Sequence, residues 1–330
     1  MYVRRVNDIP SARVVATNMG NLFGRYTPEI KQPVRALKIK ENEALVQLRV
    51  IWKDYDYNEM DSAKDSGIKF LELSDKLKTM KYSAEDVQNF SIVLAEFQEE
   101  HRFETKAGFF LSALINSGSD KSYTIFTDHL GTRISALGNQ NDKNIIVIGD
   151  VGYSVGINMK NGSMLIRGNA GNWVGAGMTG GKIIVEGNAG EEVGYSMDGG
   201  TIEVMGNAGD RVGFIMFNGR IIIHGNIGTS VGYEMYNGEI LVRGSAGKAV
   251  GAGMKNGKIT VEGNAAMTIG SDMQGGIIII SGHAGGWIGL GMLGGEIHLN
   301  GTYEELAPAY SINGRIYHKG ILIADKQGEK

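Results

Sequence analysis

The hydrophobic and polar positions in the second half of this chain recur with a period of nineteen residues. Beginning at Gly149, a glycine returns at every nineteenth position as far as Gly320. A second glycine stands thirteen residues after each phase-setting glycine and always follows Asn or Gly, as in Asn161-Gly162 and Asn218-Gly219. Such pairs tolerate a positive φ, so the pattern predicts one tight turn in every copy.

Each predicted turn is followed by a short apolar alternation, such as residues 183–185 or 259–261, which is typical of a β-strand. A second strand is expected where two glycines bracket a Val or Ile, as in residues 171–175 and 209–213. A nineteen-residue unit of short strands is too short for a propeller blade and has no helix for a leucine-rich repeat. The repeat therefore predicts one turn of a β-solenoid per copy.

Columns of one residue type run through the copies. The glycine column includes Gly168, Gly187, Gly206 and Gly225, and a methionine column ten residues later includes Met178, Met197, Met216 and Met235. Strands stacked at about 4.8 Å would turn the apolar columns into internal ladders, in which methionine is an adaptable core filler. Asparagine recurs directly after the glycine, and we expect those amides to stack at a corner.

Residues 1–126 carry no repeat and are predicted to form a separate small α/β or α+β domain. Residues 44–52 alternate like a strand, whereas the capping-box sequence that starts at Ser83 predicts a helix over 83–101. Further helices are expected over 106–115 and 68–80. We expect this domain to cover the first coil of a solenoid spanning 127–320, and residues 321–330 to form a tail.

Composition narrows the function. The net charge is −3, there is no long apolar run, and the start of the chain has no signal-peptide pattern, so the sequence predicts a cytoplasmic protein without a membrane partner. The absence of cysteine excludes disulfides, thiolate metal sites and a cysteine nucleophile. Histidines show no metal-ligand spacing and no basic stripe follows the repeat, so neither a metal, a cofactor nor a nucleic acid is expected.

One motif suggests catalysis when it is taken alone. Residues 152–156, GYSVG, match the G-x-S-x-G nucleophile elbow at Ser154, and residues 228–232 match it again. Both glycines belong to repeat columns, however, and the serine column elsewhere holds Trp, Glu, Arg and Ala. A serine esterase that uses Ser154 is therefore the disfavoured alternative.

Outward-facing aromatic residues are the candidates for partner binding. Trp173 and Trp287 occupy one column of the repeat, and Tyr195 and Tyr233 occupy another. Large aromatic side chains on an exposed surface often anchor a protein partner, although a tryptophan can also pack over a neighbouring coil.

Two segments carry a resemblance to a known family. Residues 168–185, GNAGNWVGAGMTGGKIIV, resemble the GXGXG repeat of the C-terminal domain of the glutamate synthase large subunit, a repeat that also occurs in formylmethanofuran dehydrogenase, in one of its scaffold subunits. Residues 127–135, TDHLGTRIS, resemble the lead-in D-R-x-x-G-A-R-L-S of glutamate synthase, with His129 where that family has Arg. The resemblance implies a mainly β fold, a right-handed single-stranded β-helix of nineteen-residue coils.

The same resemblance implies a function without catalytic residues. It describes a structural or interaction subunit that supports separate oxidoreductase or amidotransferase subunits, as in glutamate synthase. A scaffold like that of formylmethanofuran dehydrogenase is the alternative within this class. A small-ligand-binding module between the N-terminal domain and the solenoid, and assembly as a homo-oligomer, are left open by the sequence.

Overall fold

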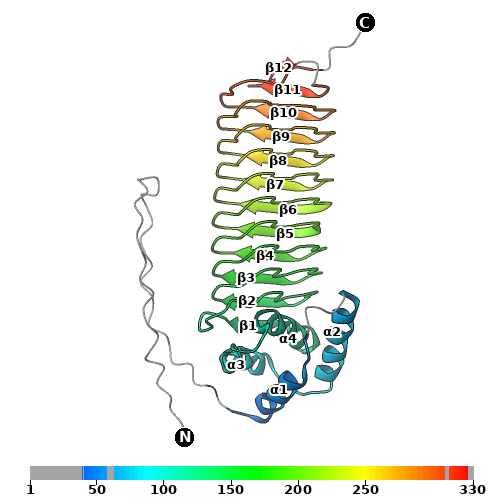
Figure 1. Cartoon of the computed structure of the whole chain (residues 1–330), viewed down its shortest axis with the longest axis vertical. Coiled ribbons are helices and arrows are strands. Elements are labelled where there is room, and N and C mark those ends of the chain that lie inside the picture. Colours follow the sequence, from blue (N-terminus) through cyan, green and yellow to red (C-terminus); the bar gives the residue numbers. More distant parts are fainter. Residues whose placement is uncertain (1–38, 40, 58–62, 309–311, 326–330) are drawn as a thin grey trace, which may run out of the picture. The chain divides into compact units, whose positions relative to one another are not determined.

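The computed structural model describes residue 39 and residues 41–57, 63–308 and 312–325. All of these belong to one compact unit, Ile39–Lys330. Within the described residues, four α-helices come first and a stack of short strands follows (Figure 1).

In the described part of the chain, eleven strands pair in parallel, one per coil, in the order of the sequence. Ile183 pairs with Ile202, which in turn pairs with Ile221, so the register step between these strands equals one nineteen-residue repeat. The parallel strands are β1 (Ser122–Phe126), β2 (Asn144–Ile148), β3 (Ser163–Arg167), β4 (Lys182–Val185), β5 (Asp198–Val204), β6 (Asn218–Ile223), β7 (Glu239–Val242), β8 (Lys258–Val261), β9 (Ile277–Ile280), β10 (Glu296–Leu299) and β11 (Arg315–His318). The protein is mainly β, and the predicted solenoid of nineteen-residue coils is confirmed.

The expected second strand in each coil is wrong. The glycine-bracketed segments form tight turns, and outside the main strands neighbouring coils are joined by single backbone hydrogen bonds and by isolated bridges such as Ala246 to Ala265. The residue at the centre of each bracket has a positive φ whatever its type, including Trp173 at 63° and Arg211 at 57°. A strand needs a negative φ, so the bracketing glycines mark a turn.

The apolar columns form the core of the solenoid. Every methionine of the column from Met159 to Met292 is fully buried, as are the flanking Val and Ile positions. From Met178 to Met292, the methyl group of each methionine also lies against the turn glycine of the next coil. A Cβ added to Gly219, for example, would lie 2.8 Å from Cε of Met197. The turn glycine is thus required by sterics as well as by its φ of +100°.

The asparagine ladder stacks as expected, but each amide bonds to backbone. Oδ1 of Asn169 accepts the backbone N–H of Asn188 at 2.9 Å, and Oδ1 of Asn188 accepts that of Asn207 at 2.8 Å. The ladder therefore satisfies one backbone donor per coil at a corner where the strand hydrogen bonds end.

The N-terminal region is helical over its described residues, and the strand expected over 44–52 is wrong. That segment lies in α1 (Glu43–Asp54), whose first turn is capped by the side chain of Asn42. The buried residues are Leu45, Leu48, Ile51 and Trp52, spaced as one face of a helix. Val46 and Val50, which completed the alternation in the sequence, are exposed.

The three helices predicted from the sequence are present with shifted ends. The helix expected over 68–80 is α2 (Ala63–Lys78), and that over 106–115 is α4 (Phe103–Ser117). The helix expected over 83–101 ends early, as α3 (Ala84–Val93) followed by one 3₁₀ turn, η1 (Leu94–Glu96). Its capping box is formed by Ser83 and Asp86.

Both ends of the solenoid are covered. At the β1 end, Oγ of Ser91 in α3 accepts the backbone N–H of Phe126 at 3.0 Å, and α4 packs on residues 134–138 of the first coil (Figure 1). At the other end, β12 (Ile321–Ala324), within the expected tail, turns back and pairs antiparallel with β11. One apolar core runs from α1 to β11 without a break.

Candidate functional site

Three aromatic rings stack on the turns that precede β5, β6 and β7. They belong to Tyr195, Phe214 and Tyr233, and we call them the aromatic ladder. Successive ring centroids lie 5.5 Å apart, with interplanar angles of 55° and 62°. Tyr233 is 37% exposed and the other two rings are half-buried. The nineteen-residue period places these residues directly above one another.

A second aromatic pair lies three residues further along two of the same coils. Phe217 stacks on Tyr236 with a centroid distance of 4.8 Å, and both residues are 40% exposed. The ammonium group of Lys255 lies 3.6 Å from the centroid of the Tyr236 ring. On other coils the ladder column holds Ile157, Ala176, Ala252, Ser271 or Leu290. The solenoid therefore does not need aromatic rings at this position, and their concentration on three coils creates an exposed aromatic surface.

The two tryptophans are not part of this surface. Trp173 contacts Tyr153 of the preceding coil edge-on at 6.3 Å, and its Nε1 donates to Oε2 of Glu192 at 2.7 Å. Trp287 lies six coils later and is 46% exposed, and its side chain makes no hydrogen bond or ring contact with any residue that the structure describes. The structure thus joins Tyr195 and Tyr233 through Phe214 and leaves Trp173 and Trp287 apart.

Sequence reasoning missed Phe214, Phe217 and Tyr236. Aligning every copy of the repeat would have placed Phe214 between Tyr195 and Tyr233 in a single column. The second pair could have been found in the same way, because Phe217 and Tyr236 are also nineteen residues apart.

Ser154 faces a cavity of about 380 Å³ where α2 and α4 meet the first coils. We call it the junction cavity. Its described lining consists of Tyr57, Gly67, Phe70, Thr105, Phe109, Ala136, Asn139, Gln140, Tyr153, Ser154, Ile157 and Asn158. That lining contains no imidazole and no carboxylate, so it places no general base beside the Ser154 hydroxyl. The φ of Ser154, 57°, is shared by its whole column and is a property of the coil.

The helical side of the junction cavity is aromatic. The ring of Phe109 in α4 stacks on Tyr57 at 5.4 Å and meets Phe70 of α2 edge-on at 5.9 Å. Oγ1 of Thr105 and the hydroxyl of Tyr153 form a hydrogen bond of 2.7 Å that ties α4 to the solenoid. The helices and the first coil are therefore held together around the cavity.

The solenoid side of the cavity is polar. Asn139 is only 6% exposed, and its backbone is bonded on both sides: its N–H donates to Oγ of Ser112 at 3.2 Å, and its carbonyl accepts from Nδ2 of Asn116 at 3.0 Å. Its side-chain amide, in contrast, makes no hydrogen bond to any described residue, although it lines the cavity. Although the residue is largely buried, its amide is not among the fully enclosed polar groups without a partner, so it opens into the cavity and can hydrogen-bond a ligand there.

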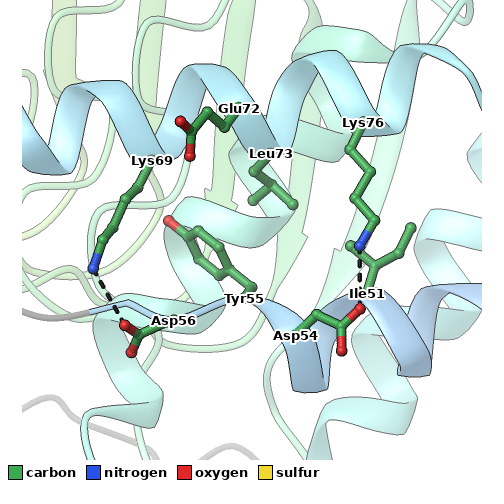
Figure 2. Close-up of a pocket in the computed structure, with 8 residues that line it drawn as sticks. All are labelled: Ile51, Asp54, Tyr55, Asp56, Lys69, Glu72, Leu73 and Lys76. Carbon is green, nitrogen blue, oxygen red and sulfur yellow. Dashed lines mark hydrogen bonds and ion pairs between the residues drawn. The ribbon is translucent and has the colours of Figure 1, made fainter.

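A smaller cavity of about 250 Å³ lies between α1 and α2 (Figure 2). Lys69 and Lys76 reach across from α2 to Asp56 and Asp54, with N–O distances of 3.4 and 3.2 Å. Burial, and then the neighbouring Tyr57, raise the pKa of Tyr55 in its floor. Carboxylates engage both lysines and Glu72 adds a third acidic group, so the described lining of this crevice carries paired cations and a net negative charge.

A half-buried histidine also lies at the helix–solenoid junction. Nε2 of His129 is 3.2 Å from the carbonyl oxygen of Ile92 at the end of α3. Burial lowers the pKa of His129, and this effect outweighs the opposing influence of the Ile92 carbonyl and of Asp128. The imidazole is therefore held in its neutral form as part of the packing between α3 and the first coil.

The described residues contain no group of three or more His, Asp or Glu side chains arranged to hold a metal ion. Within the same part of the chain, no helix is both long and apolar enough to cross a membrane.

Comparison with known proteins identifies the repeat. Residues 182–317 match the GXGXG motif family. The match spans β4 to β11. No curated protein matches the chain. The GXGXG repeat that the sequence indicated is thus present as a solenoid, and the helical region at its β1 end lies outside the matched segment.

Proposed function

We propose that this chain is a non-catalytic structural and interaction subunit, similar to the C-terminal domain of the glutamate synthase large subunit. In this proposal it acts in the cytoplasm and supports oxidoreductase or amidotransferase subunits made as separate chains. The GXGXG match over residues 182–317 and the exposed aromatic ladder support it.

The aromatic ladder carries the proposal. Tyrosine and phenylalanine rings at the centre of an interface often supply most of its binding energy, because they bury large areas with little loss of side-chain entropy. The ladder is flanked by Phe217 and Tyr236 on the same coils and by the Lys255 ammonium. A protein partner that presents apolar side chains with a carboxylate at the rim fits this surface.

A photocrosslinking amino acid at position 233 tests the proposal in cells. We expect it to capture an oxidoreductase or amidotransferase subunit. The same crosslinking amino acid at position 258, on the exposed sheet face, is the control and should capture none. Flavin-containing or amidotransferase subunits would favour the glutamate synthase likeness. Molybdopterin-dependent subunits would favour the alternative, a scaffold like that of formylmethanofuran dehydrogenase.

A matched pair of alanine substitutions measures the contribution of the ladder. Tyr233→Ala should weaken co-purification of the captured protein by about tenfold or more, because loss of a hot-spot ring costs about 2 kcal/mol. Leu290→Ala is the control, because Leu290 occupies the same column with the same 37% exposure. If both variants bind alike, or if position 233 captures no such subunit, the proposal is wrong.

A further inference from the structure

The junction cavity has the features of a binding site for a small neutral ligand. Its volume of about 380 Å³ lies within the usual range of small-molecule sites, and its wall combines aromatic rings with a few polar groups. Tyr57 and Phe70 flank the Phe109 ring, so the helical side offers aromatic faces and edges against which a planar ring can pack.

The polar groups of the cavity offer paired donors and acceptors. Asn139 is 94% buried, yet its amide opens into the cavity and has no hydrogen-bond partner among the described residues, so it is available to a ligand. A carboxamide presents one acceptor and one donor side by side, which matches the edge of a nucleobase. The hydroxyl of Ser154 and the amide of Asn158 line the same cavity.

The charge of the cavity limits the ligand class. Its described lining contains no charged side chain, so a phosphate or carboxylate inside would lose its hydration without gaining a counter-charge. The ammonium group of Lys160 hydrogen-bonds Oε1 of Gln140 at 3.3 Å, so it is engaged at the edge of the site.

We propose that the junction cavity binds a neutral purine base or its nucleoside, stacked against Phe109 and hydrogen-bonded by Asn139 and Ser154. Aromatic stacking holds the ring, and the Asn139 amide reads its hydrogen-bonding edge. The proposal is independent of partner binding at the aromatic ladder, because the two sites share no residue.

Calorimetric titration of the full chain with adenosine tests this site. We expect saturable one-to-one binding, and weaker binding of AMP because its phosphate would meet no cation inside the cavity. Absence of binding by both adenosine and guanosine, or AMP binding tenfold tighter than adenosine, would overturn the proposal.

Four variants locate the site without disturbing the fold. Asn139→Ala keeps both backbone hydrogen bonds of that residue and should weaken adenosine binding by about tenfold, the equivalent of one good hydrogen bond. Ser154→Ala should weaken it by about threefold to tenfold. Ser230→Ala is the matched control, because Ser230 has the same motif and a φ of 60° on a distant coil, and it should bind as the parent does.

Gly67→Leu, the fourth variant, fills the cavity from α2. A Cβ at Gly67 would meet no atom within 4 Å, so the larger side chain can occupy the open space without a backbone clash. We expect adenosine binding to be lost while the melting temperature stays level or rises. Undiminished binding in Gly67→Leu, or an equal loss in Ser154→Ala and Ser230→Ala, would place the ligand elsewhere and reject the proposal.

Discussion

Two coils of the solenoid carry the same five-residue pattern in different surroundings. Ser154 and Ser230 are both bracketed by glycines, have φ values of 57° and 60°, and precede fully buried valines. Each serine N–H donates at 2.8 Å to the next coil. Ser154, however, faces α2 and α4 across the junction cavity, whereas Ser230 lies between β6 and β7, far from the helices (Figure 1).

The comparison shows that the motif itself is a product of the repeat. The backbone of both coils is set by the glycine columns, so the G-x-S-x-G match describes a turn and carries no chemistry of its own. What distinguishes Ser154 is the helical region packed beside it. We use the name free coils for the coils that no helix contacts. Changes at the junction should therefore have different consequences from changes in the free coils.

The largest effect is expected at the junction itself. Gly108 of α4 packs so closely on the first coil that an added Cβ would overlap the carbonyl oxygen of Ser135. Gly108→Ala should lower the free energy of unfolding by about 3 kcal/mol, because backbone atoms must move apart. Chemical denaturation measures this change.

Gly67→Ala in α2 is the control for Gly108→Ala. A Cβ there meets no atom within 4 Å, so the substitution should raise stability by about 0.5 to 1 kcal/mol through helix propensity. Equal effects of the two substitutions would mean that α4 does not rest on the first coil as described.

An intermediate effect is expected on a free coil. Gly219 has a φ of +100°, and a side chain there would also meet the methyl group of Met197. Gly219→Val should destabilise the protein by about 2 kcal/mol, from backbone strain together with overpacking. Thermal or chemical unfolding provides the measurement.

Gly320→Val separates the two causes. Gly320 has a similar φ of +80° in the turn before β12, but no atom lies within 4 Å of its added Cβ. We expect about half the loss seen at Gly219. If Gly219→Val proves as mild as Gly320→Val, the contact between the methionine column and the turn glycine contributes nothing.

The regular coils could be predicted from the sequence because every position is repeated. Because the pattern recurs in nine copies, an exceptional residue in one copy does not hide it. The strands, the turn glycines and the buried methionines therefore follow from the columns alone. The glycine-bracketed segment resembles a strand in the sequence because its central Val or Ile suggests one. Closely spaced positions with positive φ, such as Glu192 and Gly194, make it a turn instead.

The helical region offers no such averaging. Residues 44–52 fit an alternating pattern and a helical pattern equally well, since Leu48 and Trp52 belong to both. Burial decides between them: Trp52 is surrounded by Phe97, Phe103 and Phe110, which come from sequence positions far along the chain. The junction cavity was equally hidden, because its lining comes from α2, α4 and the first coils, which only the folded chain brings together.

The smallest effect is expected from acidification, and it should again separate the junction from the free coils. Burial lowers the pKa of His129 below its ordinary value of about 6.5, so the unfolded chain binds a proton more readily than the folded protein. Stability should be complete above about pH 6.5 and should fall as the pH drops from there towards the pKa of the folded state. Partial exposure limits the loss to about 1 kcal/mol.

On a free coil, Glu203 responds in a different window. Hydrogen bonds from His224 and then Lys182 lower the pKa of Glu203, so its contribution is present above about pH 4.5 and is lost only as the pH falls further. His129→Gln should therefore flatten the stability profile below about pH 6.5, whereas Glu203→Gln should lower stability above about pH 4.5 and flatten the profile only below that pH. Denaturant unfolding across this range checks both, and a profile for His129→Gln that follows the parent would show that the junction does not hold this imidazole neutral.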